Sequence, residues 1–139
     1  MKEKAFDVKL DTNGLDSRML EECLPYLDYV ALDVKTSPSK YPSLGAENTT
    51  ELIRTIDILK TGNVDYEFRT TVVPGFVETS DIHTMSELVK GARTWALQQF
   101  IPGDTLDTEL NSVKPYPPET IDKYAETLRA YAENIVLRK

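Results

Sequence analysis

This chain has few of the residue types that mark common active sites. Its 139 residues include one cysteine, one histidine and one tryptophan. A single cysteine excludes a disulfide within the chain and cannot supply the several thiolates of a metal centre. The sequence also has no glycine-rich phosphate loop, no metal-spaced set of histidines and cysteines, and no serine nucleophile elbow. Any function must therefore rest on less distinctive residues.

Long apolar runs and an excess of basic residues are missing as well. No apolar segment approaches the length of a membrane span, and the N-terminal Met-Lys-Glu-Lys leads into a strand pattern without the apolar core of a secretory signal. We therefore expect a cytoplasmic protein that does not bind membranes. Lys and Arg total 16 against 23 Asp and Glu, a net charge of -7. Because such a surface repels a phosphate backbone, we expect no nucleic-acid partner.

Strand-like apolar runs alternate with helical patterns along the chain. The predicted strands cover residues 6–10, 29–35, 66–73, 95–101 and 135–137, and the predicted helices cover 17–27, 49–60, 80–90 and 118–133. This alternation favours right-handed βαβ units and an α/β fold with a mainly parallel sheet. We predict a single domain over residues 1–139, because a chain of this length can bury an ordinary core.

Several local signals refine this prediction. Asn48 or Thr49 can cap the second helix, and Gly62 can end it in the left-handed αL conformation. Cys23 falls on the apolar face of the first helix, which predicts a packed thiol rather than a nucleophile. The polar loop from Pro102 to Pro118 is long for a compact domain, so it is a candidate lid or partner surface.

Polar side chains stand at the ends of three predicted strands. Asp33 and Lys35 end the run 29–35, and the period of two in a strand places them on one face. Because the carboxyl ends of parallel strands share one rim, we expect polar residues of the neighbouring strands beside them: Asp11, Thr12, Asn13 and Arg69. Carboxylates can accept ribose hydroxyls or an ammonium group, and Lys and Arg can hold a carboxylate or phosphate. The combination suits a zwitterionic or nucleoside-like ligand.

These residues also have plain structural interpretations. Asx residues and glycine, as in the segment 11–14, are what any strand-to-helix turn prefers. Lys35 could be a surface lysine paired with Asp33, and Arg69 could form an ion pair at the rim. A Schiff base is another alternative for Lys35, if burial lowers its pKa.

Five segments, taken in order, resemble the C-terminal half of radical S-adenosylmethionine (SAM) activating enzymes. They are Val8–Gly14, Tyr29–Lys35, Phe68–Gly75, Leu97–Pro102 and Val113–Pro117. The likeness is greatest to the activators of two glycyl-radical enzymes, anaerobic ribonucleoside-triphosphate reductase and pyruvate formate-lyase. Together the segments span nearly the whole chain.

The resemblance implies a partial (β/α)6 barrel to which this chain contributes the third strand onward, with helices on the outer face. It implies that SAM lies across the barrel and that a [4Fe-4S] cluster reduces it to a 5'-deoxyadenosyl radical, which abstracts hydrogen from a glycine of the partner enzyme. Matching positions assigns Asp33, Val34 and Lys35 to the lining of the SAM site. The resemblance places the other candidates beside that site or facing the same cavity: Asp11, Thr12, Asn13 and Arg69.

The chain departs from the family pattern in two respects. The family's Cys-x3-Cys-x2-Cys motif and its glycine-rich SAM-binding segment are expected upstream of Met1, so this chain contains no cluster ligands. Ile101 stands where the pyruvate formate-lyase activator has a SAM-contacting histidine. We expect this contact to be lost or to be replaced by Gln98 or Gln99.

The barrel strands that this chain lacks also predict a physical weakness. Half a barrel would expose a strand edge and an apolar inner face, which favours aggregation or pairing. We therefore expect the C-terminal portion of an activase, inactive alone, with a glycyl-radical enzyme as the partner of the whole protein. The alternative is a non-catalytic module that binds a SAM-like ligand, docks on a separate N-terminal half, or associates with itself through the open edge.

Overall fold

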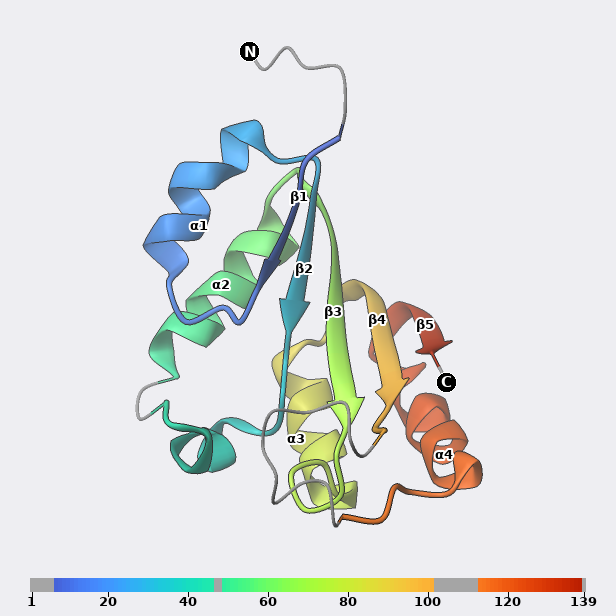
Figure 1. Ribbon diagram of the computed structural model, residues 1–139. Helices are drawn as coiled ribbons and strands as arrows, with labels where there is room; N and C mark the ends of the chain where they lie inside the picture. Colours follow the sequence, from blue (N-terminus) through green and yellow to red (C-terminus); the bar gives the residue numbers. More distant parts are fainter. Residues whose placement is uncertain (1–6, 47–48, 102–112, 139) are drawn as a thin grey trace.

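The computed structural model describes residues 7–46, 49–101 and 113–138. Within these ranges the chain forms a five-stranded sheet in the order β1-β2-β3-β4-β5, and every neighbouring pair is parallel (Figure 1). The strands are Lys9–Thr12 (β1), Tyr29–Asp33 (β2), Asp65–Val72 (β3), Ala92–Gln99 (β4) and Ala132–Arg138 (β5). Consecutive strands are neighbours in the sheet, so the chain advances by βαβ units. The predicted α/β fold is confirmed.

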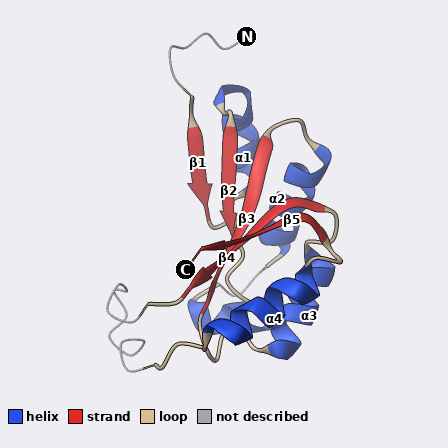
Figure 2. Ribbon diagram, turned by 90° about the vertical axis from the view of Figure 1, so that its right-hand side faces the viewer, coloured by secondary structure: helices blue, strands red, loops and turns tan. Residues whose placement is uncertain are grey.

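The helices cover one face of this sheet. The α-helices are Ser17–Cys23 (α1), Thr50–Thr61 (α2), Thr79–Leu88 (α3) and Pro118–Leu128 (α4), and the 3-10 segments are Leu24–Tyr26 (η1) and Pro38–Leu44 (η2). Figure 2 shows α1 to α4 on the same side of the strands, with the other face free of them. A parallel sheet with helices on one side only is consistent with a partial barrel, whose outer face carries the helices. None of the helices in the described ranges combines the length and apolar character of a bilayer span.

The core lies between the sheet and the helices. Alternate residues of β2 and β3, such as Leu32 and Phe68, point into it and are fully buried. Trp95 of β4 is also buried, and its Nε1–H donates to Thr70 Oγ1 at 2.9 Å. Thr70 Oγ1 in turn donates to the carbonyl oxygen of Val34 at 2.7 Å. These bonds tie the end of β2 to β3 and β4 directly beneath the rim.

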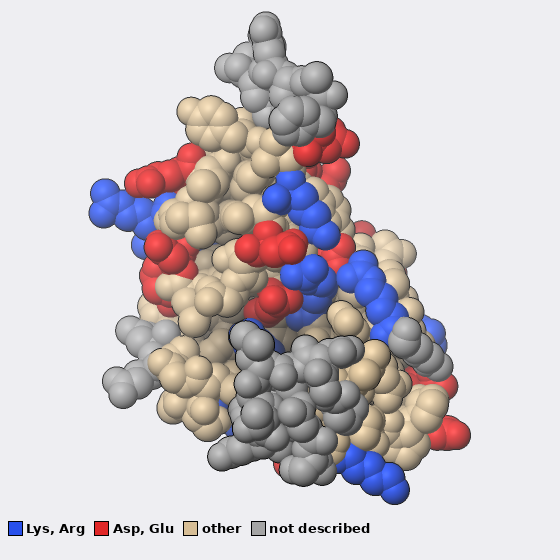
Figure 3. Space-filling view, viewed as in Figure 1, with Lys and Arg blue, Asp and Glu red and all other residues tan. Residues whose placement is uncertain are grey.

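The face without helices, which we call the open face, is polar, so the prediction of an exposed apolar inner face is wrong. Figure 3 looks onto this face and shows acidic and basic side chains side by side across the sheet. Glu67 pairs there with Arg138, and Asp33 pairs with Arg69. Ala31, which alternates with Tyr29 and Asp33 along β2, is fully buried. Ion pairs therefore occupy a large part of the open face.

Some element boundaries differ from the prediction. Helix α1 ends at Cys23 and gives way to η1, because Pro25 lacks the N–H that an α-helix needs there. Gly62 follows α2 in an extended conformation (φ -91°, ψ -173°), so the predicted αL stop is wrong. A Cβ at Gly62 would lie 2.9 Å from the carbonyl oxygen of Ile58, and this close approach explains the glycine.

The C-terminal elements are also shifted. Helix α4 begins at Pro118 as predicted but ends at Leu128, because β5 already begins at Ala132 and runs to Arg138. Strand β2 ends at Asp33, so Lys35 lies two residues beyond it. Of the predicted loop 102–118, residues 102–112 lie outside the described residues, as does the predicted cap Asn48.

Candidate ligand-binding site

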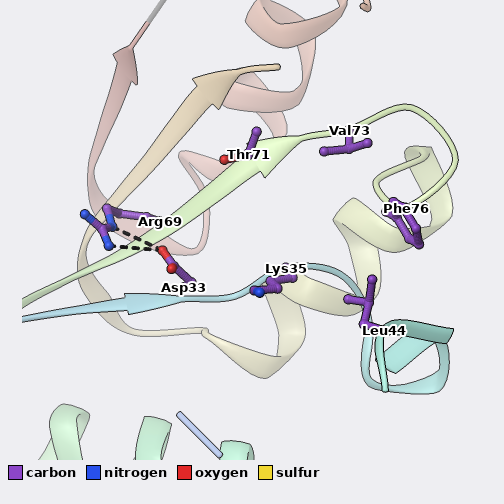
Figure 4. A pocket seen from close by; sticks show the side chains of 7 residues that line it. All are labelled: Asp33, Lys35, Leu44, Arg69, Thr71, Val73 and Phe76. Carbon is purple, nitrogen blue, oxygen red and sulfur yellow. Dashed lines mark hydrogen bonds and ion pairs between the residues drawn. The ribbon is translucent and has the colours of Figure 1, made fainter. Parts of the chain in front are cut away.

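A pocket of about 350 Å³ lies at the carboxyl ends of β2 and β3, on the open face. Its lining combines charged, hydroxyl and apolar side chains: Asp33, Lys35, Leu44, Arg69, Thr71, Val73 and Phe76 (Figure 4). The volume falls within the range of small-molecule sites. The place is the one at which parallel α/β sheets bind their ligands.

The charged end of the pocket is built on a cross-strand pair. Asp33 and Arg69 face each other in the β2–β3 register, and Arg69 Nη2 lies 3.2 Å from Asp33 Oδ1. The same Nη2 lies 3.7 Å from Oδ1 of Asp11 on β1. Arg69 therefore forms the rim ion pair that its structural interpretation predicts, and it brings three of the predicted residues together across three strands.

Lys35 lines the pocket but forms no pair with Asp33. In the described ranges the Asp33 carboxylate is paired with Arg69, so the predicted Lys35–Asp33 ion pair is wrong. The backbone N–H of Lys35 donates to the hydroxyl of Tyr41 at 3.0 Å, which anchors the chain at this point. Burial raises the pKa of the Tyr41 phenol, so the anchor stays neutral. The Lys35 ammonium is thereby presented to the pocket from a fixed backbone.

Four of the seven predicted site residues do not line the pocket. Thr12 Oγ1 accepts a hydrogen bond from the Gly14 N–H at 3.1 Å, and Asn13 Oδ1 accepts one from the N–H two residues on at 3.0 Å. Both side chains therefore stabilise the turn into α1. Val34 is fully buried, because it alternates with Asp33 and Lys35 and points into the core. Asp11 is outside the lining too but contacts it through Arg69.

Four lining residues were not predicted. Thr71 and Val73 continue the period of two from Arg69, so the strand pattern could have revealed them. Leu44 belongs to η2 and Phe76 to the loop between β3 and α3. No periodicity in the sequence points to either of these two, because their positions depend on how the two loops fold.

The two glutamines proposed to replace the family histidine lie on opposite faces of β4. Gln98 is exposed and is paired in register with Thr71 of the pocket. Gln99 Nε2 instead donates to the carbonyl oxygen of Tyr116 at 3.0 Å, on the other face. Ile101 follows the strand and is 51% exposed. Of the two glutamines, Gln98 is the one beside the pocket.

A second charged cluster lies on the open face, and its members are hydrogen-bonded to one another. Glu67 is buried and accepts hydrogen bonds from Tyr29 Oη at 3.0 Å and Arg138 Nη1 at 2.8 Å. Burial alone would raise the pKa of Glu67, but the bonds from Arg138 and Tyr29 hold it below its ordinary value. Burial and the bond to Glu67 raise the pKa of Tyr29 to about 12. Since the partners satisfy one another, this cluster stabilises the sheet.

The described residues contain no metal-binding arrangement. No three histidine, cysteine, aspartate or glutamate side chains within these ranges are grouped to hold an ion. Cys23 is partly buried on α1 and packs against the core, with its Sγ 3.7 Å from the Sδ of Met19. The predicted packed thiol is confirmed.

The chain is similar to a known protein along nearly its whole length. No protein-family model matches the chain. The chain is 36% identical over 146 aligned residues to a protein of Methanocaldococcus jannaschii that carries the provisional name of a glycyl-radical enzyme activating enzyme. The alignment covers 99% of this chain and 60% of that relative. The chain therefore spans about three fifths of the relative's length.

Proposed function

We propose that this chain belongs with the glycyl-radical enzyme activating enzymes, as its sequence predicts, and that it provides one wall of the SAM site in such an enzyme. The observation that carries this proposal is the pocket lined by Asp33, Lys35 and Arg69 at the carboxyl ends of β2 and β3. The activity proposed for the whole enzyme is reductive cleavage of SAM to a 5'-deoxyadenosyl radical, which takes hydrogen from a glycine of its partner.

The lining fits SAM in its chemistry. SAM joins an amino-acid end that carries both charges to a nucleoside. Figure 4 shows Asp33 and Arg69 at one end of the pocket, Leu44 and Phe76 at the other, and Lys35 between them. Lys35 would hold the ligand carboxylate, and Asp33 would accept hydrogen bonds from its ammonium or ribose hydroxyls. Arg69, already paired with two carboxylates, would orient Asp33.

The chain's own residues do not fit a [4Fe-4S] cluster. Cys23 is its only cysteine, and such a cluster needs at least three thiolates from the family motif. We therefore propose that the cluster ligands come from another part of the enzyme and that this chain alone does not cleave SAM. Non-catalytic ligand binding is then the second candidate function for the chain by itself.

The architecture also supports a proposal about partners. The described residues share one sheet and one core, which supports a single domain over residues 1–139. Among the described strands, β1 pairs only with β2 and leaves an open edge. We propose that the N-terminal portion of the activase, or a separate half, pairs with this edge. The partner of the complete enzyme would be a glycyl-radical enzyme of the ribonucleotide reductase or pyruvate formate-lyase type.

Calorimetry with S-adenosylhomocysteine, a stable SAM analogue, tests the binding proposal. We expect the chain to bind it and Asp33→Asn to weaken binding about tenfold, the loss of one charge-assisted hydrogen bond. Asp65→Asn is the matched control, since Asp65 pairs with Arg93 at the other end of β3 and lies outside the pocket. No heat from the unaltered chain, or equal losses in the two variants, would contradict the proposal.

A second experiment tests whether the chain needs other segments for catalysis. After reconstitution with iron and sulfide and addition of a strong reductant, we expect no 5'-deoxyadenosine above the protein-free blank. Production of 5'-deoxyadenosine that depends on the protein would show that the chain is catalytically complete.

A further inference from the structure

The apolar end of the pocket is formed by two separate loops. Leu44 comes from η2, between β2 and α2, and Phe76 comes from the loop between β3 and α3. Between residues 36–46 and residues 73–81, the described parts of these two connections, there is no backbone–backbone hydrogen bond. Their relative position therefore depends on side chains.

Two side chains of the first loop reach the backbone of the second. Thr36 Oγ1 donates to the carbonyl oxygen of Phe76 itself. Lys40 Nζ donates to the carbonyl oxygen of Gly75 at 3.0 Å. The backbone beside the pocket-lining Phe76 is thus held from the loop that also carries Leu44.

Asp81 is the charged centre of this connection. Its Oδ2 lies 2.6 Å from Lys40 Nζ, and its Oδ1 accepts a hydrogen bond from Ser37. Asp81 is only 3% exposed, and its Oδ2 also accepts the backbone N–H of Glu78 at 2.9 Å in the capping box of α3. Burial alone would raise the pKa of Asp81, but the bonds from Lys40, Ser37 and Glu78 hold it below its ordinary value. The carboxylate is therefore charged at neutral pH.

We propose that Asp81 is a positioning residue for the pocket: through Lys40 and Ser37, it fixes the loop that carries Leu44 against the loop that carries Phe76. Asp81 is absent from the lining, so it acts on a ligand only through these loops. A buried, charge-assisted contact suits this role, because it has a defined geometry and its loss leaves an unpaired charge. The identity of the ligand rests on the function proposed above, whereas the coupling of the two loops does not.

Lys40→Met and Ser37→Ala test the coupling without removing the α3 cap, which Asp81 still forms with Glu78. Lys40→Arg keeps the cation and serves as the rescue variant. Arg54→Met is the matched control, because it breaks a charge pair with Glu21 that joins α2 to α1 and involves no pocket residue. Hydrogen exchange by mass spectrometry on the ligand-free full chain then reports each loop separately.

In Lys40→Met we expect the amides of residues 36–46 and 73–78 to exchange about tenfold faster, while those of β2 and β3 are unchanged. Lys40→Arg should restore most of the protection, and Arg54→Met should leave it unaltered. Unchanged exchange in Lys40→Met, a rise limited to one loop, or a rise that extends through β2 and β3 would overturn the proposal.

Ligand affinities provide a readout that a merely structural role would not produce. Lys40→Met should weaken S-adenosylhomocysteine and adenosine by the same factor, about tenfold, because the loops form the apolar end. Lys35→Met should weaken S-adenosylhomocysteine more than adenosine, because adenosine has no carboxylate. If the ratio of the affinities for S-adenosylhomocysteine and adenosine changed equally in Lys40→Met and Lys35→Met, the assignment of Asp81 to the apolar end would be refuted. Failure of the unaltered chain to bind either ligand would refute the proposed function, and the exchange data would still decide the coupling.

Discussion

Arg69 and Asp33 are cross-strand partners at the rim of the sheet, and both Nε and Nη2 of Arg69 lie 3.2 Å from Asp33 Oδ1. Nη2 is also 3.7 Å from Asp11 on the next strand. A guanidinium between two carboxylates neutralises their repulsion and fixes the direction in which Asp33 faces the pocket. We therefore expect the pair to matter more for ligand binding than for stability.

Arg69→Met is expected to separate these two effects. The pair is partly exposed, so the free energy of unfolding should fall by about 1 kcal/mol or less. Affinity for S-adenosylhomocysteine should fall about tenfold, since Asp33 loses its orientation and two carboxylates are left unneutralised. Urea unfolding and calorimetry measure the two quantities. Arg93→Met, which breaks the exposed pair with Asp65, should leave affinity unchanged, and an equal effect there would contradict the prediction.

Gly14, in the turn between β1 and α1, is expected to be required for the close packing of that turn against the core. A Cβ there would lie 2.6 Å from Leu32 Cδ1 and 2.9 Å from Leu52 Cδ1, and the residue has φ of 75°. Gly14→Ala should reduce the free energy of unfolding by about 2–5 kcal/mol, the sum of backbone strain and overpacking. Gly91→Ala shares the positive φ but meets no atom within 4 Å, so it should cost about 1–2 kcal/mol. Equal losses in urea unfolding would show that packing at Gly14 is unimportant.

Glu67 is expected to contribute to the free energy of unfolding at neutral pH and to lose this contribution in acid. Its pKa in the folded protein lies below the ordinary value of 4.5, so the folded state favours the charged form. The resulting stability is present above about pH 4.5 and is lost as the pH falls through the folded pKa. Glu67→Gln should therefore cost about 1.5–3 kcal/mol at pH 7 and progressively less below pH 4.5.

Urea unfolding between pH 3 and pH 7 measures this difference. Glu22→Gln is the control, since its pair with Arg18 is largely exposed and should contribute less than about 1 kcal/mol at any pH. A Glu67→Gln penalty that stays constant across the range would contradict the role assigned to the charged form.

Thr70 is expected to support the end of β2 from beneath. Thr70→Val leaves the buried Trp95 N–H and the Val34 carbonyl without their partner, which should cost about 1–3 kcal/mol. Trp95 is the only tryptophan, so the loss of its hydrogen bond should shift the intrinsic emission to the blue. Thr71→Val, on the opposite face, should change stability by less than about 0.5 kcal/mol and leave the emission unaltered. An unchanged spectrum in Thr70→Val would contradict the assigned bond.

Most of the framework was predictable because it depends on short-range patterns. Apolar residues at period two in strands and at spacings of three and four in helices identified the elements, and their alternation predicted the parallel sheet. The period of two also predicted that Asp33 and Lys35 reach the same pocket. The boundaries were less predictable. The conformation of Gly62 depends on local backbone contacts, whereas the end of α1 follows from Pro25 and could have been predicted.

The site was predictable only in part. The sequence shows which residues end the strands, but it does not show that Asp33 pairs with Arg69 rather than with Lys35, because that choice follows from the β2–β3 register. The resemblance assigned Val34 to the lining, whereas the period of two that joins Asp33 and Lys35 already places Val34 on the opposite face, where it is fully buried.

By itself, the sequence determined the parallel α/β framework, the family resemblance and, through its single cysteine, the lack of cluster ligands. Only the tertiary structure decided that the open face is polar, that Leu44 and Phe76 form one end of the pocket, and that Asp81 joins their loops. The physical reason is the separation of the residues along the chain. A periodic pattern is formed by residues close in sequence, whereas Ser37 and Asp81 are 44 residues apart and meet only after the sheet has brought the two loops together.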